Sequence, residues 1–110
     1  MSNTTIPNSW VLISLGKPNQ YKIFGSWIGG YLSGDSWRLN SGIKSSTLEN
    51  NVFIVKGYSG SVYHCGTNNY GVAGSYNQGI LEGLMKDYPI LELISEAEAM
   101  VILNGFISEI

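Results

Sequence analysis

The stretch "STLENNVFIVKGYSGSVYHCG", residues 46 to 66, predicts a β-hairpin. Residues with high strand propensity lie on both sides of Ser59-Gly60, a dipeptide suited to a two-residue turn. A turn at that point would pair Val55 with His64 and Ile54 with Cys65. The second strand of this predicted hairpin therefore carries the only histidine and the only cysteine of the chain side by side.

The pair His64 and Cys65 is not expected to be catalytic. Neighbouring side chains on a strand point to opposite faces of the sheet, so these two groups could not act together as nucleophile and base. The chain has no second histidine to serve Cys65 instead. A structural zinc site needs four nitrogen or sulfur ligands, and only two are present. We predict structural roles for both residues, no catalytic residue, no metal site and no cofactor.

The rest of the first two thirds of the chain also has the pattern of short strands. Residues 9–15 end at the turn-forming sequence Gly16-Lys17-Pro18-Asn19, and residues 20–28 then alternate between two faces. Another strand-like run covers residues 37–43. Together with the hairpin, these runs predict an N-terminal antiparallel sheet of about five short strands.

The last third has a helical period. Residues 75–88 form an amphipathic pattern with Ser75 as the expected N-cap, and Gly79 and Gly83 are expected to pack closely against the sheet. Ser95 to Glu98 matches a capping box, which predicts a second helix over 96–103. Residues 1–110 are thus predicted to be a single α+β domain in which two C-terminal helices pack on the sheet.

Composition favours a soluble, cytoplasmic protein. The chain is 44% hydrophobic and 13% charged, and one cysteine cannot form an internal disulfide. The N-terminus lacks the pattern of a signal peptide, and no apolar stretch approaches the length of a membrane span. We therefore expect no membrane association.

Charge is unevenly distributed along the chain. Residues 1–75 hold five Lys and Arg against two Asp and Glu, whereas residues 76–110 hold one lysine against six acidic residues. The five cations are spread along the chain rather than clustered, so nucleic acid is not expected to be a direct ligand. The acidic C-terminal part could orient a partner of opposite charge.

Aromatic residues and arginine supply the candidate binding residues. The run "GSWIGGYLSGDSW", residues 25 to 37, matches no phosphate-binding loop, but it is rich in aromatic side chains. Tryptophan, tyrosine and arginine often carry most of the binding energy at protein interfaces. The interface candidates are Trp27, Tyr31, Trp37, Arg38, Tyr58 and Tyr63, with Glu96 and Glu98 on the acidic second helix.

Two segments carry a resemblance to known proteins. The sequences "GDSWRLNSGI" (34–43) and "GYSGSVYHCG" (57–66) resemble segments of small uncharacterised proteins of bacterial accessory genomes and prophages, over about residues 9–85. The resemblance carries no catalytic motif, and it implies only that the protein is encoded by a phage or mobile element. Small phage-encoded proteins of this length often act as stoichiometric inhibitors of host defence, and the anti-CRISPR proteins are examples.

The sequence therefore favours a small non-enzymatic binding protein, encoded by a phage or mobile element, that inhibits a host defence complex by protein–protein contact. The alternative from a different class is a small-ligand or nucleotide-binding module, in which aromatic faces stack on a base. An enzyme using Cys65 or His64 and a self-assembling structural protein, including a homodimer, are the remaining alternatives.

Overall fold

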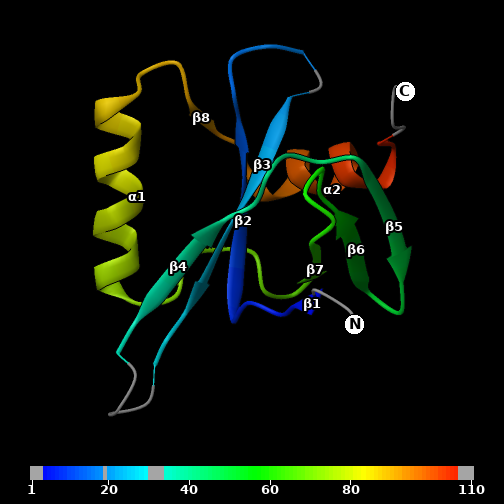
Figure 1. The fold of residues 1–110 in the computed structure, drawn as a ribbon, viewed down its shortest axis with the longest axis horizontal. Coiled ribbons are helices and arrows are strands. Elements are labelled where there is room, and N and C mark those ends of the chain that lie inside the picture. Colours follow the sequence, from blue (N-terminus) through cyan, green and yellow to red (C-terminus); the bar gives the residue numbers. More distant parts are fainter. Residues whose placement is uncertain (1–3, 19, 30–33, 107–110) are drawn as a thin grey trace.

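The computed structural model describes residues 4–18, 20–29 and 34–106, which hold eight strands rather than about five, one of them between the two helices (Figure 1). The strands are β1 (Thr4–Thr5), β2 (Ser9–Ser14), β3 (Tyr21–Trp27), β4 (Ser36–Leu39), β5 (Ser45–Glu49), β6 (Val52–Lys56), β7 (Val62–Gly66) and β8 (Glu92–Leu93), and the helices are α1 (Ser75–Asp87) and α2 (Glu96–Asn104). The predicted α+β class is confirmed, with most strands N-terminal and the helices C-terminal. None of the helices in the described residues is long and apolar enough to cross a bilayer.

The strands form two four-stranded sheets rather than the single sheet that was expected. One sheet has the order β1-β7-β6-β5 and the other has the order β4-β3-β2-β8. The β2–β3 hairpin is antiparallel as predicted, with Ser14 opposite Tyr21 at its closed end. The short strand β1 pairs parallel to β7, so the sheets are not wholly antiparallel.

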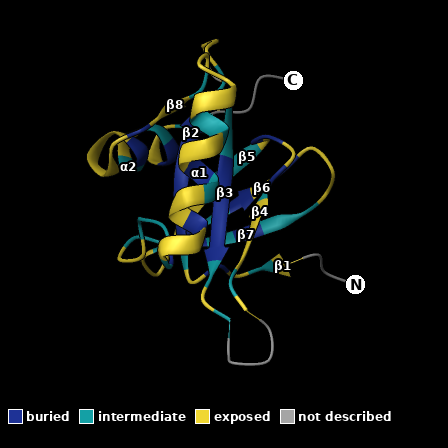
Figure 2. Cartoon of the chain, turned by 90° about the vertical axis from the view of Figure 1, so that its left-hand side faces the viewer, coloured by how far each residue is buried: buried dark blue, intermediate teal, exposed yellow. Residues whose placement is uncertain are grey.

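The sheet β4-β3-β2-β8 is covered on both faces. Because side chains alternate along a strand, Trp10 and Leu12 of β2 point toward the other sheet, whereas Val11 and Ile13 point toward α1. Figure 1 shows α1 lying on the outer side of this sheet, and Figure 2 shows its buried strands behind the helix. The larger core, which lies between the sheets, is centred on Trp10 and also contains Phe53 of β6.

Helix α1 begins differently from the prediction. Its N-cap is Gly74 rather than Ser75, and no side chain caps it. Gly74 has a φ of 80°, and a Cβ placed there would lie 2.6 Å from a carboxylate oxygen of Asp35. The Asp35 carboxylate therefore lies close to the N-terminus of α1, where negative charge is favourable. The buried amide of Asn77 fixes the helix by donating hydrogen bonds to the carbonyls of Trp27 and Ala73.

The prediction that Gly79 and Gly83 pack against the sheet is wrong. Both glycines are exposed, and a Cβ at either position would have no neighbour within 4 Å. The helix faces the sheet with Leu81 instead, supported by the partly buried Ile80 and Leu84.

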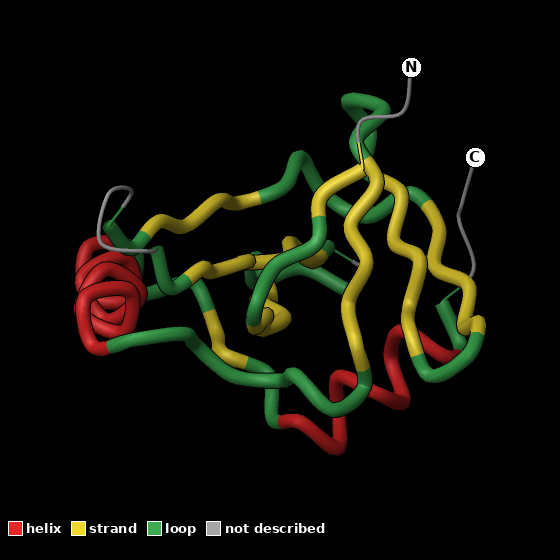
Figure 3. Tube along the Cα trace, turned by 90° about the horizontal axis from the view of Figure 1, so that it is seen from below, coloured by secondary structure: helices red, strands yellow, loops and turns green. Residues whose placement is uncertain are grey.

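Helix α2 agrees with its prediction at both ends. The Ser95 hydroxyl accepts a hydrogen bond from the Glu98 amide at 3.3 Å, and the helix ends at Gly105 as its C-cap. Its buried residues Ala99 and Leu103 belong to the core between the sheets. Figure 3 shows α2 along one side of the two sheets, opposite to the side where β4 and β1 lie.

The segment 46–66 contains three strands rather than two. Asn50 and Asn51, with φ of 51° and 64°, form a two-residue turn between β5 and β6. The connection between β6 and β7 is five residues long, because Lys56 pairs with Val62. The predicted pairing was therefore wrong by one residue: His64 lies opposite Ile54.

Candidate functional site

His64 and Cys65 point to opposite faces of β7, as the strand pattern predicts. Cys65 is wholly buried in the core between the sheets, and its strand partner is Phe53. His64 is partly exposed on the outer face, opposite Ile54. The two side chains therefore do not meet in a common site, and no cluster of three metal-ligating side chains occurs in the described part of the chain.

Cys65 is expected to be chemically inert in the native protein. Burial raises the pKa of its thiol, so at pH 8 the reactive thiolate is rarer than in the unfolded chain. We predict negligible labelling by 5,5′-dithiobis(2-nitrobenzoic acid) at pH 8, and one equivalent in 6 M guanidinium chloride. Stoichiometric labelling of the native protein within seconds would contradict the buried position.

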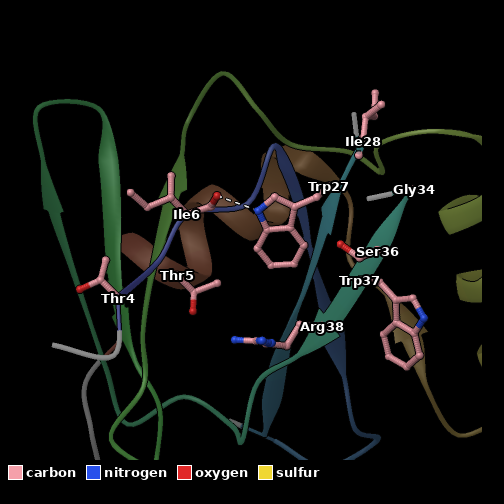
Figure 4. Close-up of a pocket in the computed structure, with 10 residues that line it drawn as sticks. Thr4, Thr5, Ile6, Trp27, Ile28, Gly34, Ser36, Trp37 and Arg38 are labelled. Carbon is pink, nitrogen blue, oxygen red and sulfur yellow. Dashed lines mark hydrogen bonds between the residues drawn. The ribbon is translucent and has the colours of Figure 1, made fainter. Parts of the chain in front are cut away.

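A cleft lies at one end of the two sheets. Its volume is about 610 Å³. One wall is the N-terminal segment that includes β1 and Ile6, and the other wall comes from the end of β3 and from β4, as Figure 4 shows. The cleft is lined by Thr4, Thr5, Ile6, Trp27, Ile28, Gly29, Gly34, Ser36, Trp37 and Arg38. Three of the predicted interface residues, Trp27, Trp37 and Arg38, are among these lining residues.

Trp27 joins the two walls of the cleft. Its indole Nε1 donates a hydrogen bond of 3.0 Å to the carbonyl of Ile6, drawn in Figure 4. The neighbouring Ile28 amide is bound by the side chain of Asn8 at 2.8 Å. These bonds hold the N-terminal segment against the end of β3, so one face of the Trp27 ring is available to the cleft while its polar edge is satisfied.

Arg38 places a positive charge in the cleft. It is exposed on β4 and lies opposite Gly25 of β3. Its charge acts on the hydroxyl of Tyr63: burial raises the pKa of Tyr63, and Arg38 partly offsets that rise. The acidic residue nearest to Arg38 in sequence, Asp35, is engaged elsewhere, since it accepts a hydrogen bond from the Gly29 amide and lies against Gly74.

Trp37 lies on the other face of β4. Its ring stacks on Phe24 of β3, with ring centroids 5.5 Å apart and an angle of 10° between the planes. The side chain nevertheless stays 38% exposed. Figure 4 shows Trp37 pointing away from Trp27 and Arg38, so β4 presents an aromatic ring on one face and a cation on the other.

The remaining candidates do not join this cleft. Tyr58 is 66% exposed and lines a separate hollow of about 300 Å³ together with Tyr21 and Ile43. Glu96 and Glu98 are exposed at the start of α2. Tyr63 was predicted to be at an interface, but it is 1% exposed and packs in the core between the sheets. Tyr31 lies outside the described residues.

Sequence reasoning missed the N-terminal wall of the cleft. Thr4, Thr5 and Ile6 carry no recognisable motif, and they reach the site only because β1 pairs with β7, about 58 residues further along the chain. Ile6, which follows the two threonines, is exposed in the structure, and nothing in its local sequence indicates this.

Comparison with known proteins gives no relative for this fold and site. No protein-family model matches the chain, and no match was found among curated proteins or solved structures.

Proposed function

We propose that this chain is a non-enzymatic binding protein that acts in the cytoplasm by contact with a larger protein partner. The observation that carries the proposal is a cleft with Trp27 and Arg38 on the same face of its β3–β4 wall, beside Trp37, whose partly exposed ring lies on the other face of β4. Exposed tryptophan and arginine beside a concave surface are the groups that most often dominate protein interfaces.

The chemistry of the described residues supports binding more than catalysis. The one thiol is buried away from the cleft, and His64 is on the outer face of the other sheet. The groups that line the cleft are hydroxyls, aromatic rings, backbone and one guanidinium. Such groups recognise and orient a partner, but none of them is a general base near neutral pH.

The finer proposal is that the partner is a host defence complex and that the chain is a phage- or mobile-element-encoded inhibitor. It rests on the resemblance of residues 34–43 and 57–66 to small prophage proteins. The first of these segments contains β4, which forms one wall of the cleft. Stoichiometric inhibition requires only a stable contact surface.

Site-specific photo-crosslinking in the cell of origin tests the proposed contact. A photoreactive phenylalanine analogue replaces Trp37 in one variant and Val101, which is 72% exposed on α2, in a control variant. We expect a discrete crosslinked protein from position 37 and not from position 101. Adding Arg38→Glu to the position-37 variant should reduce the crosslinked fraction severalfold, because a desolvated charge at an interface is costly to reverse.

Two outcomes would contradict the proposal. Equal crosslinking from positions 37 and 101 would mean that the partner does not bind preferentially at β4. Absence of any crosslinked protein, together with a rise in melting temperature on adding a nucleotide, would favour the alternative of a small-ligand module, for which the cleft has a suitable volume.

A further inference from the structure

The edge strand β4 has backbone groups beside the cleft that meet no partner among the described residues. It ends the sheet order β4-β3-β2-β8, and β3 is its one strand neighbour among the residues that the structure describes. The backbone amide of Asn40 donates a hydrogen bond of 3.0 Å to the carbonyl of Ile23. This bond shows which backbone amides of β4 face β3. Amides alternate in direction along such a strand, so those of Ser36 and Arg38 face β3. The backbone N–H and C=O groups of Trp37 and Leu39 therefore point away from the sheet.

The side chains on β4 set requirements for any strand that pairs there. A residue opposite Arg38 would lie on the cleft face, next to the guanidinium. The residues before and after it would lie on the other face, against the Trp37 ring and Leu39. The pattern that fits is an acidic residue between two apolar residues, because opposite charges and apolar pairs are favourable across strands.

Charge disfavours a second copy of this chain as the occupant. Two copies could pair through antiparallel β4 strands. The free backbone groups of Trp37 and Leu39 are all used in both copies only if Trp37 of one copy lies opposite Leu39 of the other. That register places the two Arg38 side chains directly opposite each other, and like charges in this position are destabilising.

We infer that β4 is the docking edge of this protein, and that it takes an extended segment of the partner with the pattern apolar–acidic–apolar. The inference rests on the proposed function and specifies its partner. The segment extends the sheet by one strand through the free backbone groups of Trp37 and Leu39, while Arg38 selects a carboxylate. Natural proteins usually protect such an edge from non-specific pairing with charged side chains. Here the Arg38 side chain both disfavours non-specific pairing and favours a strand that carries a carboxylate.

The test uses two blocked heptapeptides, STVEVTS and STVKVTS, titrated into the full chain labelled with ¹⁵N. We expect the glutamate peptide to bind with a dissociation constant of about 1 mM or lower and on the order of tenfold more tightly than the lysine peptide. On binding, the amide protons of Trp37 and Leu39 should move downfield and become protected from hydrogen exchange. Those of Ser36 and Arg38 serve as internal controls, because they are already paired with β3.

The variant Arg38→Glu is the matched control. Residue 38 is exposed, so the fold should be retained, and the peptide preference should reverse in favour of STVKVTS. Equal affinity of the two peptides, or no binding of either at 5 mM (about five times the expected constant), would overturn the inference. Chemical-shift changes confined to another surface would overturn it too. So would protection of the Trp37 and Leu39 amides from hydrogen exchange that appears without peptide and grows with protein concentration, because it would indicate self-association. Crosslinking from position 37 is scored separately, so the proposed function can survive failure of edge pairing.

Discussion

Replacement of Trp10 by alanine is expected to lower the free energy of unfolding by about 3–5 kcal/mol, the largest effect of any single substitution that we predict. The indole is wholly buried between the sheets. Its ring meets Tyr70 edge-on at a centroid distance of 4.8 Å and Phe53 at 6.5 Å. Its Nε1 donates a 2.7 Å hydrogen bond to the carbonyl of Gly66 at the end of β7. The substitution therefore removes both the centre of the core and a bond between the sheets.

Urea unfolding followed by circular dichroism at 222 nm measures this loss without depending on tryptophan fluorescence. Trp10→Phe separates the two contributions, because it keeps most of the apolar volume but removes the indole donor from the Gly66 carbonyl, which still accepts a hydrogen bond from the Asn69 amide. We expect that variant to lose about 0.5–1.5 kcal/mol. Val101→Ala, at an exposed position of α2, should stay within about 0.5 kcal/mol of the parent. A Trp10→Ala protein as stable as the Val101→Ala protein would show that the core is not centred on Trp10.

The sequence pattern predicted the strand that carries Trp10, but it did not predict that Trp10 lies in the core between two sheets. A run such as residues 9–15 is apolar at consecutive positions, which is typical of a strand buried on both faces. Which face meets a second sheet and which meets a helix depends on residues far away in the chain. Here β6 and β7 supply one neighbour and α1 the other.

The hairpin at 46–66 shows how a local signal can be misassigned. The Asn50-Asn51 dipeptide is a strong turn signal, since asparagine tolerates the positive φ that a two-residue hairpin turn requires. The prediction placed the only turn of this segment at Ser59-Gly60, after the apolar run 52–55. Because that connection takes five residues, the pairing moved by one, although the alternation that separates His64 from Cys65 was unaffected.

Helix α1 shows the limit of composition as a guide to packing. Glycines one turn apart can mark a close helix contact, but in α1 they face away from the sheet. The buried polar residue of this helix, Asn77, had no sequence signal, because its partners are the carbonyls of Trp27 and Ala73. Tertiary hydrogen bonds of this kind depend on the assembled fold and cannot be inferred from a helical period.

For the candidate site, the sequence suggested which residue types to consider but not where they lie in the fold. Trp27, Trp37 and Arg38 were chosen because of their chemistry, and all three line the cleft. Tyr63 was chosen for the same reason, yet its strand turns it into the core. Its ring lies 3.5 Å from where a Cβ on Gly25 would be, so the β3 backbone passes close to it.

The position of β4, and hence of the proposed docking edge, depends on Asn40. This side chain is 4% exposed, and its Oδ1 accepts hydrogen bonds from the amides of Ile23 at 2.8 Å and Gly42 at 3.3 Å. Its Nδ2 donates to the carbonyl of Gly42 at 3.0 Å. One amide group thus joins the start of β3 to the turn that follows β4.

Asn40→Ala is expected to lower the free energy of unfolding by about 1–3 kcal/mol, because the buried Ile23 amide loses its acceptor. Asn40→Asp keeps that acceptor but places a carboxylate against the Gly42 carbonyl in a buried position, so we expect a loss at least as large at pH 7. Urea unfolding gives both values, and hydrogen exchange at Ile23 reports the bond directly. Since Asn40 fixes the end of β4 without lining the cleft, the alanine variant should also weaken binding of STVEVTS while preserving its preference over STVKVTS. Parent-like stability together with unchanged exchange at Ile23 would show that β4 is held by its ladder with β3 alone.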